Sequence, residues 1–112
     1  MRLRALLAAG VMVVSAAGMV AQTPVGGPLF HFPHTLFMKD TCTISIKDPA
    51  ASLLEDRGDI LMASAKYGKG TVFAVADPWI YNEYTNGQNL PPEYDNLGGA
   101  VELVNWLVKQ VP

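Results

Sequence analysis

A cluster of polar and aromatic side chains follows the apolar run 72–76 and is the strongest candidate for a ligand site. It comprises Asp77, Trp79, Tyr81, Asn82, Glu83 and Tyr84. Aromatic faces beside amide and carboxylate groups suit sugars, because a pyranose ring offers apolar C–H faces as well as hydroxyl groups. In open α/β sheets ligands bind beyond the carboxyl ends of strands, where Asp77 is expected to lie. The alternative is that the aromatic residues cover the end of the sheet while Asp77 caps loop amides.

No residue of this chain is expected to be catalytic. Asp77 and Glu83 have the chemistry of a glycosidase pair, which needs a separation of roughly 5–9.5 Å, but nothing in the spacing fixes that separation. Cys42 lies inside the alternating segment TCTISI, on the same side as Ile44 and Ile46. That position predicts a buried thiol rather than an activated nucleophile.

His31 and His34 are the weak candidates for a metal site. They stand three residues apart around Pro33, so in a polyproline-type segment they would share a face. No cysteine joins them, and no third ligand follows at a diagnostic spacing. We therefore expect neither a metal nor another cofactor.

The segment 60–76 predicts a β-hairpin. Ile60–Lys66 and Thr71–Ala76 flank the turn Tyr67–Gly70, whose glycines can take the positive φ of a tight turn. The second strand is apolar on both faces from Val72 to Ala76. Such a run indicates a strand covered on both sides, at a central position in an α/β sheet.

Three further segments lie before and after the hairpin. Thr41–Ile46 alternates between polar and apolar residues and predicts a half-buried strand. The segment 49–59 is expected to form a short helical turn or loop that Gly58 ends. Residues 96–111 predict a C-terminal helix, capped by Asp95 or Asn96. One broad face of it is apolar and is expected to pack on the sheet: Leu97, Ala100, Val101, Val104, Leu107, Val108 and Val111.

Residues 1–21 have the composition of a secretory signal peptide. Arg2 and Arg4 precede an uncharged stretch, and small residues stand before a cleavage point after Ala21. The apolar run is shorter than the roughly 20 residues that a membrane span needs, so an uncleaved anchor is the lesser alternative. Residues 22–36 are rich in proline and glycine and are expected to be an extended lead-in. We expect a secreted or periplasmic protein.

Removal of residues 1–21 leaves 91 residues, enough for one domain with a small core. Six of the 8 basic residues and all 10 acidic ones remain, a formal charge of −4. That balance argues against nucleic acid as a partner, and no polybasic segment suits a membrane surface. Cys42 is the only cysteine, so no internal disulfide can form. The domain must rely on packing, on a partner or on another copy of itself.

The stretches YGKGTVFAVADPWIYNEYTNGQNLPPEYDN and AVELVNWLVKQ resemble the C-terminal part of secreted bacterial unsaturated rhamnogalacturonyl hydrolases. In that family an (α/α)₆-barrel catalytic domain is followed by an accessory domain similar to class I glutamine amidotransferases. The resemblance runs from about Phe37 to Gln110 and covers only the second half of that accessory domain. It implies a truncated flavodoxin-like or amidotransferase-like α/β fold over residues 37–112. The catalytic barrel lies outside the match, so no position here inherits its catalytic acid.

The preferred interpretation is a non-catalytic accessory module or remnant of a secreted pectin-degrading glycoside hydrolase. Its partners would be a pectin-derived oligosaccharide, contacted through the loop 77–96, or a glycoside hydrolase catalytic domain. One alternative is an assembly module with no ligand of its own, because open sheet edges need cover. The helix face that bears Val101, Val104, Val108 and Trp106 would then bind another chain, including a second copy. A second alternative is that the chain is part of an active unsaturated rhamnogalacturonyl hydrolase.

Overall fold

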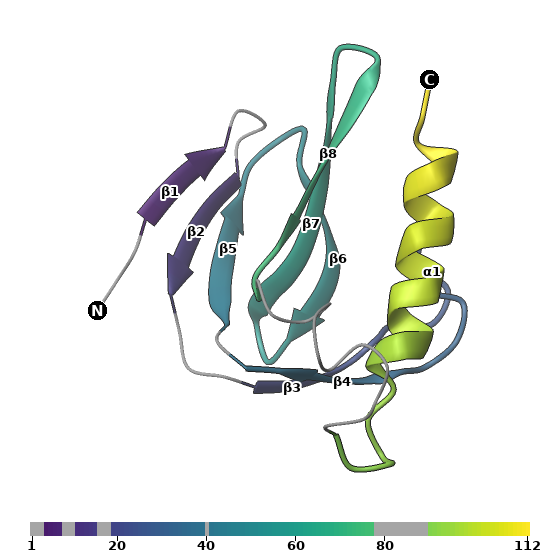
Figure 1. The fold of residues 1–112 in the computed structure, drawn as a ribbon. Coiled ribbons are helices and arrows are strands. Elements are labelled where there is room, and N and C mark those ends of the chain that lie inside the picture. Colours follow the sequence, from purple (N-terminus) through teal and green to yellow (C-terminus); the bar gives the residue numbers. More distant parts are fainter. Residues whose placement is uncertain (1–3, 8–10, 16–18, 40, 78–89) are drawn as a thin grey trace.

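Antiparallel pairing of neighbouring segments builds most of this mixed α/β structure, and one helix, α1 (Asn96–Lys109), closes it (Figure 1). The computed structural model describes residues 4–7, 11–15, 19–39, 41–77 and 90–112. The hydrogen-bonded strands form three groups: β1 (Arg4–Leu7), β2 (Val11–Ser15) and β5 (Cys42–Ile46); β3 (Met19–Gln22) and β4 (Thr35–Met38); β6 (Ala51–Asp56), β7 (Asp59–Tyr67) and β8 (Gly70–Val75). The prediction of an α/β fold with a hairpin and a C-terminal helix is confirmed at this level.

The predicted hairpin is β7–β8. Its last pair is Tyr67 with Gly70, and Gly68 takes a φ of +58°. A glycine with positive φ at the first central position is what a two-residue type II′ turn requires, and this turn matches the twist of the strands. Thr41–Ile46 is also confirmed as a strand, β5, with Ile44 buried and Ser45 exposed.

The prediction that the strand 72–76 is central is wrong. The hydrogen-bonded order is β6-β7-β8, so β8 ends this sheet and β7 is its central strand. Leu61, Met62 and Ala63 of β7 are fully buried, whereas Val72, Phe73 and Val75 of β8 are half-buried. β8 is apolar on both faces for another reason: α1 lies beside it, and the Phe73 ring packs 6.2 Å from that of Trp106.

The prediction of a helical turn or loop over 49–59 is also wrong, because this segment contains strand β6. Register shifts occur between Ser52 and Leu54 and between Leu54 and Glu55 in its pairing with β7. These irregularities put Leu53 and Leu54 both in the core, so the period-two pattern of a strand is interrupted. Arg57 and Gly58 both have positive φ, as a two-residue type I′ hairpin turn requires.

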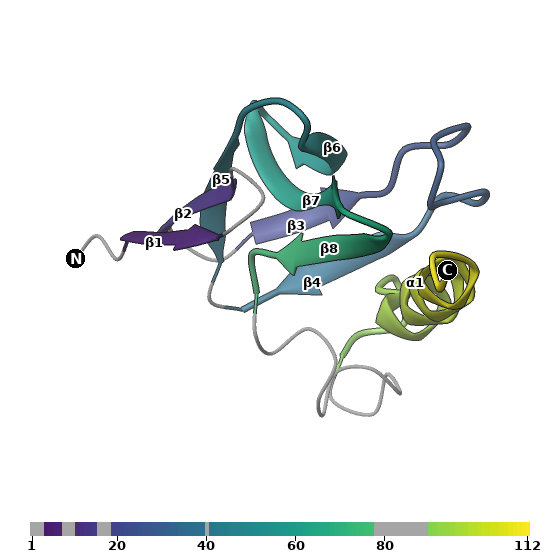
Figure 2. The same cartoon turned by 90° about the horizontal axis from the view of Figure 1, so that it is seen from above.

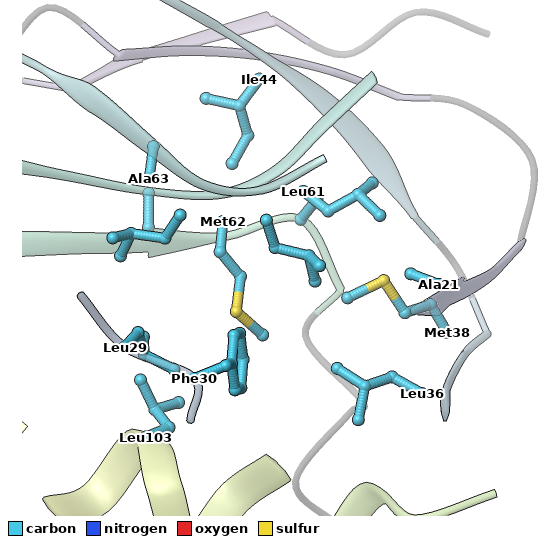
Figure 3. Packing of buried hydrophobic residues seen from close by; sticks show 14 of the residues in the cluster. Ala21, Leu29, Phe30, Leu36, Met38, Ile44, Leu61, Met62, Ala63 and Leu103 are labelled. Carbon is cyan, nitrogen blue, oxygen red and sulfur yellow. The ribbon is translucent and has the colours of Figure 1, made fainter. Parts of the chain in front are cut away.

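Residues 23–34 form a long loop between β3 and β4 rather than an extended lead-in. Its Leu29 and Phe30 are each 1% exposed and sit in the core beside Met62 and Leu103 (Figure 3). The backbone N–H of Thr23 donates to the His34 carbonyl at 2.9 Å and closes the base of this loop 23–34. The segment is therefore part of the fold.

The first 22 residues contribute three strands. β2 pairs with β5 and β3 pairs with β4, and Ala21 is fully buried. A cleavage after Ala21 would divide β3. The signal peptide stays a prediction. Within the described ranges, no helix is both long enough and apolar enough to cross a membrane.

Helix α1 begins as predicted but turns a different face to the core. The Asp95 carboxylate accepts from the Gly98 N–H at 3.0 Å and caps the helix. The side chain of Asn96 accepts from the Phe37 N–H and donates to the Phe37 carbonyl, which fixes the helix to β4. A Cβ at Gly99 would lie 2.8 Å from a methyl group of Leu36, so the glycine permits this close approach. From above, α1 stands at one side of the sheets (Figure 2).

The expectation that the apolar face of α1 packs on the sheet is wrong for five of its residues. Asn96, Gly99 and Leu103 are the buried positions of the helix. Ala100 and Leu107 are half-buried. The other five form what we call the exposed stripe: Leu97 (48% exposed), Val101 (53%), Val104 (57%), Val108 (66%) and Val111 (73%). Val111 lies just beyond the helix, which ends at Lys109 and not at residue 111 as predicted.

Candidate functional site

A groove of about 700 Å³ lies between the loop 23–34 and α1. Phe32 of the loop is 66% exposed at this groove, opposite Leu97 and Val101 of the exposed stripe. Its polar lining includes His31, His34, Asp95, Glu102, Asn105 and Lys109. The groove is therefore apolar along the stripe and ionic where the loop meets the helix.

The ionic part centres on His34, whose side chain is 8% exposed and lies between two carboxylates. Its Nδ1 is 2.6 Å from Asp95 Oδ2, and its Nε2 is 2.7 Å from Glu102 Oε2. Its backbone N–H donates to the Thr23 hydroxyl at 2.8 Å, and the Phe30 ring stands edge-on at 6.2 Å. The His34 ring is therefore fixed by Asp95 at one ring nitrogen, by Glu102 at the other, and by the Phe30 ring.

Glu102 is the most heavily bonded acidic side chain of this site and is 11% exposed. Its Oε1 accepts from the His31 N–H at 2.8 Å and lies 3.0 Å from His31 Nδ1. Its Oε2 accepts from the Phe32 N–H at 3.3 Å, besides meeting the His34 ring. One carboxylate of α1 thus contacts three residues of the loop 23–34: His31, Phe32 and His34.

These contacts shift the pKa values of both groups. Burial alone would raise the Glu102 pKa, but the donors from His31, His34 and Phe32 outweigh it and lower the pKa from 4.5 to about 2. Burial would lower the His34 pKa, but hydrogen bonds and charges from Asp95 and Glu102 outweigh it and raise the pKa above 6.5. The charged forms of both groups are therefore favoured.

The arrangement is suited to holding the loop rather than to chemistry. Both ring nitrogens of His34 are occupied, so the ring has no free nitrogen for a substrate or a metal. The two histidines, weak candidates for a metal site, both contact the Glu102 carboxylate. Among the described residues, no three acidic, histidine or cysteine side chains are placed to hold a metal ion. In the same part of the chain every buried side-chain polar atom has a hydrogen-bond partner.

Of the predicted ligand cluster, the structure describes only Asp77. Its side chain is buried, at 1% exposure, and its Oδ2 accepts from the Lys39 N–H at 2.8 Å. That is the geometry of a loop cap, the alternative given for this residue. The other predicted residues lie outside the described part of the chain: Trp79, Tyr81, Asn82, Glu83 and Tyr84.

Cys42 has the character of a structural thiol. It is half-buried in β5, and its N–H donates to the Ala76 carbonyl at 2.7 Å. Burial, together with the nearby charge of Asp77, raises the pKa of the Cys42 thiol. A raised pKa disfavours the thiolate that nucleophilic chemistry needs.

Sequence reasoning missed Asp95 and Glu102 as partners of the histidines. Asp95 was interpreted only as a helix cap, and Glu102 was not singled out. A signal was present, because Glu102 is the one acidic residue inside the helical segment 96–109. What it would meet could not be read locally, since it stands 68 residues from His34.

Comparisons of the chain with protein-family models, curated proteins and solved structures find no match.

Proposed function

We propose that this chain is a non-catalytic assembly module that pairs with a second copy of itself through the exposed stripe of α1. The observation that carries the proposal is the stripe itself, because a 14-residue helix turns its most apolar side chains to solvent. Contiguous exposed apolar surface of this kind commonly marks a protein interface.

The spacing of the stripe suits another helix. Its five residues follow one another at intervals of four, three, four and three positions. This 3.5-residue repeat keeps the four members within α1, from Leu97 to Val108, on one seam along the helix, as in a packed pair of helices. The seam runs the length of α1, about 21 Å at 1.5 Å per residue.

A second copy is the occupant that the neighbouring residues favour. In a two-fold interface the same patch must fit itself, so like charges close to the axis would face their own copies. The positions of α1 directly beside the stripe are Gly98, Ala100, Asn105 and Leu107, none of which is charged. The charged residues of the groove, which include Glu102 and Lys109, lie further around the helix.

The exposed side chains of the stripe would supply the free energy for pairing. Full burial of a valine or leucine side chain contributes about 1.5–3 kcal/mol. Scaled by the exposed fractions of the stripe, two copies together gain about 9–18 kcal/mol. Association costs about 4–15 kcal/mol, a range that overlaps this gain, so the affinity has to be measured.

The test is the mass of the purified full chain by light scattering, from about 1 to 200 µM, a range that brackets micromolar affinity. We expect a monomer–dimer equilibrium that Val104→Glu abolishes, because the charge would lie at the centre of the seam. The matched control is Val25→Glu, at a residue that is 64% exposed but lies on the loop 23–34 outside the stripe. A wild-type chain that stays monomeric throughout, or a Val104→Glu chain that dimerises normally, would refute the proposal.

The sequence resemblance supports a second proposal: the module is secreted or periplasmic and serves a pectin-degrading glycoside hydrolase. The sugar contact would come from the residues after Asp77. Asp77 is buried and accepts from the Lys39 N–H, so in this proposal it anchors the start of the segment. Calorimetric titration with rhamnogalacturonan oligosaccharides should give heat that Trp79→Ala removes. No heat from the wild-type chain would reject the sugar contact without touching the assembly proposal.

A further inference from the structure

The loop 23–34 is bound to the helical segment by two acidic side chains at opposite sides of one histidine ring. Glu102 holds the loop at His31, Phe32 and His34, and Asp95 holds it at His34 alone. Asp95 is also tied to β4, because its N–H donates to the Thr35 carbonyl at 2.8 Å. His34 therefore joins the loop to both the cap and the second turn of α1.

We propose that His34 is a protonation-dependent clasp, which closes the loop 23–34 on α1 as an imidazolium and opens on the Asp95 side when it loses its proton. The reason is the number of donors. An imidazolium has two N–H groups and satisfies both carboxylates, whereas a neutral ring has one. One of the two contacts must then set a nitrogen lone pair against a carboxylate oxygen.

The Asp95 contact is the one that breaks. Glu102 is 11% exposed and cannot reach water easily, whereas Asp95 is 54% exposed. A neutral ring therefore keeps its hydrogen on Nε2, facing Glu102. Its unprotonated Nδ1 then stands 2.6 Å from an Asp95 oxygen, and the exposed carboxylate turns to solvent.

The charged groups around the ring agree with this order of events. Asp95 faces His34 from the segment before α1, and Glu102 faces it from α1. His31 of the loop shares Glu102 and is 69% exposed, and Lys109 of α1 lines the same groove. Burial opposes the charge on His34, but the two carboxylates outweigh it and raise the His34 pKa above 6.5, so the clasp opens on the alkaline side of that value.

Opening on the Asp95 side would alter the groove. The loop then remains held by Glu102 alone, and Phe32, which lines the groove with Leu97 and Val101, belongs to this loop, so one wall of the apolar groove becomes more mobile. The clasp itself is intramolecular and does not depend on the assembly proposed above.

The test combines two measurements on the full chain between about pH 5 and 9, the range in which a histidine clasp changes charge. Histidine ring NMR shifts give the titration midpoint of His34. Amide hydrogen exchange, corrected for the intrinsic pH dependence, gives the protection of the loop 23–34 relative to β7 in the same molecule. We expect a His34 midpoint above 6.5, and a fall in relative loop protection of about tenfold or more across it.

Two variants sharpen the result. Asp95→Asn keeps a good helix cap while removing one charge, so it should lower the His34 midpoint and reduce the pH-dependence of loop protection. Glu55→Gln removes an exposed carboxylate of β6, outside the clasp, and should leave the His34 midpoint and the loop transition in place. A wild-type midpoint at or below 6.5, loop protection that does not follow the midpoint, or a larger effect from Glu55→Gln than from Asp95→Asn would overturn the proposal.

Discussion

Replacing Glu102 by glutamine tests whether one carboxylate holds the loop 23–34 in place. Glutamine has nearly the same size but no charge, and it presents one acceptor oxygen where the carboxylate presents two. In the native chain those two oxygens meet the His31 and Phe32 N–H groups and both histidine rings. The variant must leave some of these donors without a charged partner.

The pKa of Glu102 sets the size of the effect. A fall from 4.5 to about 2 corresponds to about 3 kcal/mol at 1.36 kcal/mol per unit. Water at the groove screens part of this, so we expect Glu102→Gln to lower the free energy of unfolding by about 1–3 kcal/mol. For a domain of this size that lowers the melting temperature by roughly 5–15 °C.

The pH-dependence carries a definite sign. The folded pKa of Glu102 is lowered, so its contribution is complete above pH 4.5 and is lost as pH falls through about 2. The folded pKa of His34 is raised, so its contribution is complete below pH 6.5 and is lost as pH rises through the folded value. The cost of Glu102→Gln should therefore be greatest between pH 4.5 and 6.5.

Urea unfolding of both chains at about pH 5.5, followed by Trp fluorescence and circular dichroism, measures the difference directly. Glu55→Gln, at an exposed glutamate of β6, is the control and should change stability by less than about 0.5 kcal/mol. Equal stability of Glu102→Gln and wild type at pH 5.5 would refute the reasoning. So would a cost that stays constant down to pH 2.

Two further pairs of substitutions test the fold. Leu103→Ala should lower the free energy of unfolding in urea by about 2–5 kcal/mol, because Leu103 is 4% exposed. Val108→Ala should lower it by less than about 0.5 kcal/mol in the monomer, because Val108 is 66% exposed. Similar costs for the two variants would mean that the helix turns its other face inward. Gly58→Ala should destabilise the fold by about 1–2 kcal/mol, because Gly58 has a φ of +89° and open space around it. Gly70 has no positive φ, so Gly70→Ala should leave the stability unchanged. Thermal melts that show the reverse order would contradict the assigned turns.

The elements that sequence reasoning predicted are those with a local signature. The hairpin follows from Gly68 between two strand-forming runs, and the helix start follows from Asp95 before an apolar periodic segment. The sequence pattern does not predict β6, because its irregular pairing with β7 buries two consecutive leucines. This breaks the alternation of apolar and polar residues by which a strand is predicted. The sequence does not predict the buried histidine site, because Asp95 and Glu102 stand 61 and 68 residues from His34 and meet it only in the folded chain.

The orientation of α1 shows why apolarity alone could not choose its buried face. The core-facing side offers Asn96, Gly99 and Leu103, of which only Leu103 is strongly apolar. This side of the helix is buried because of its shape and its polar contacts. Gly99 leaves room for the Leu36 side chain, and the Asn96 side chain hydrogen-bonds to the Phe37 backbone. A hydrophobic pattern detects neither of these, and it assigned the stripe to the core instead.

The same orientation links the two proposals made for the helix. Burying the Glu102 carboxylate costs solvation free energy that the loop's donors offset, so the helix is held inward by its ionic contacts with the loop. Rotating α1 to bury Val101 and Val104 would break those contacts and leave His34 charged beside the core. The fold therefore keeps the valines outside, and the apolar surface that α1 cannot bury against its own sheet is left for a second chain to cover.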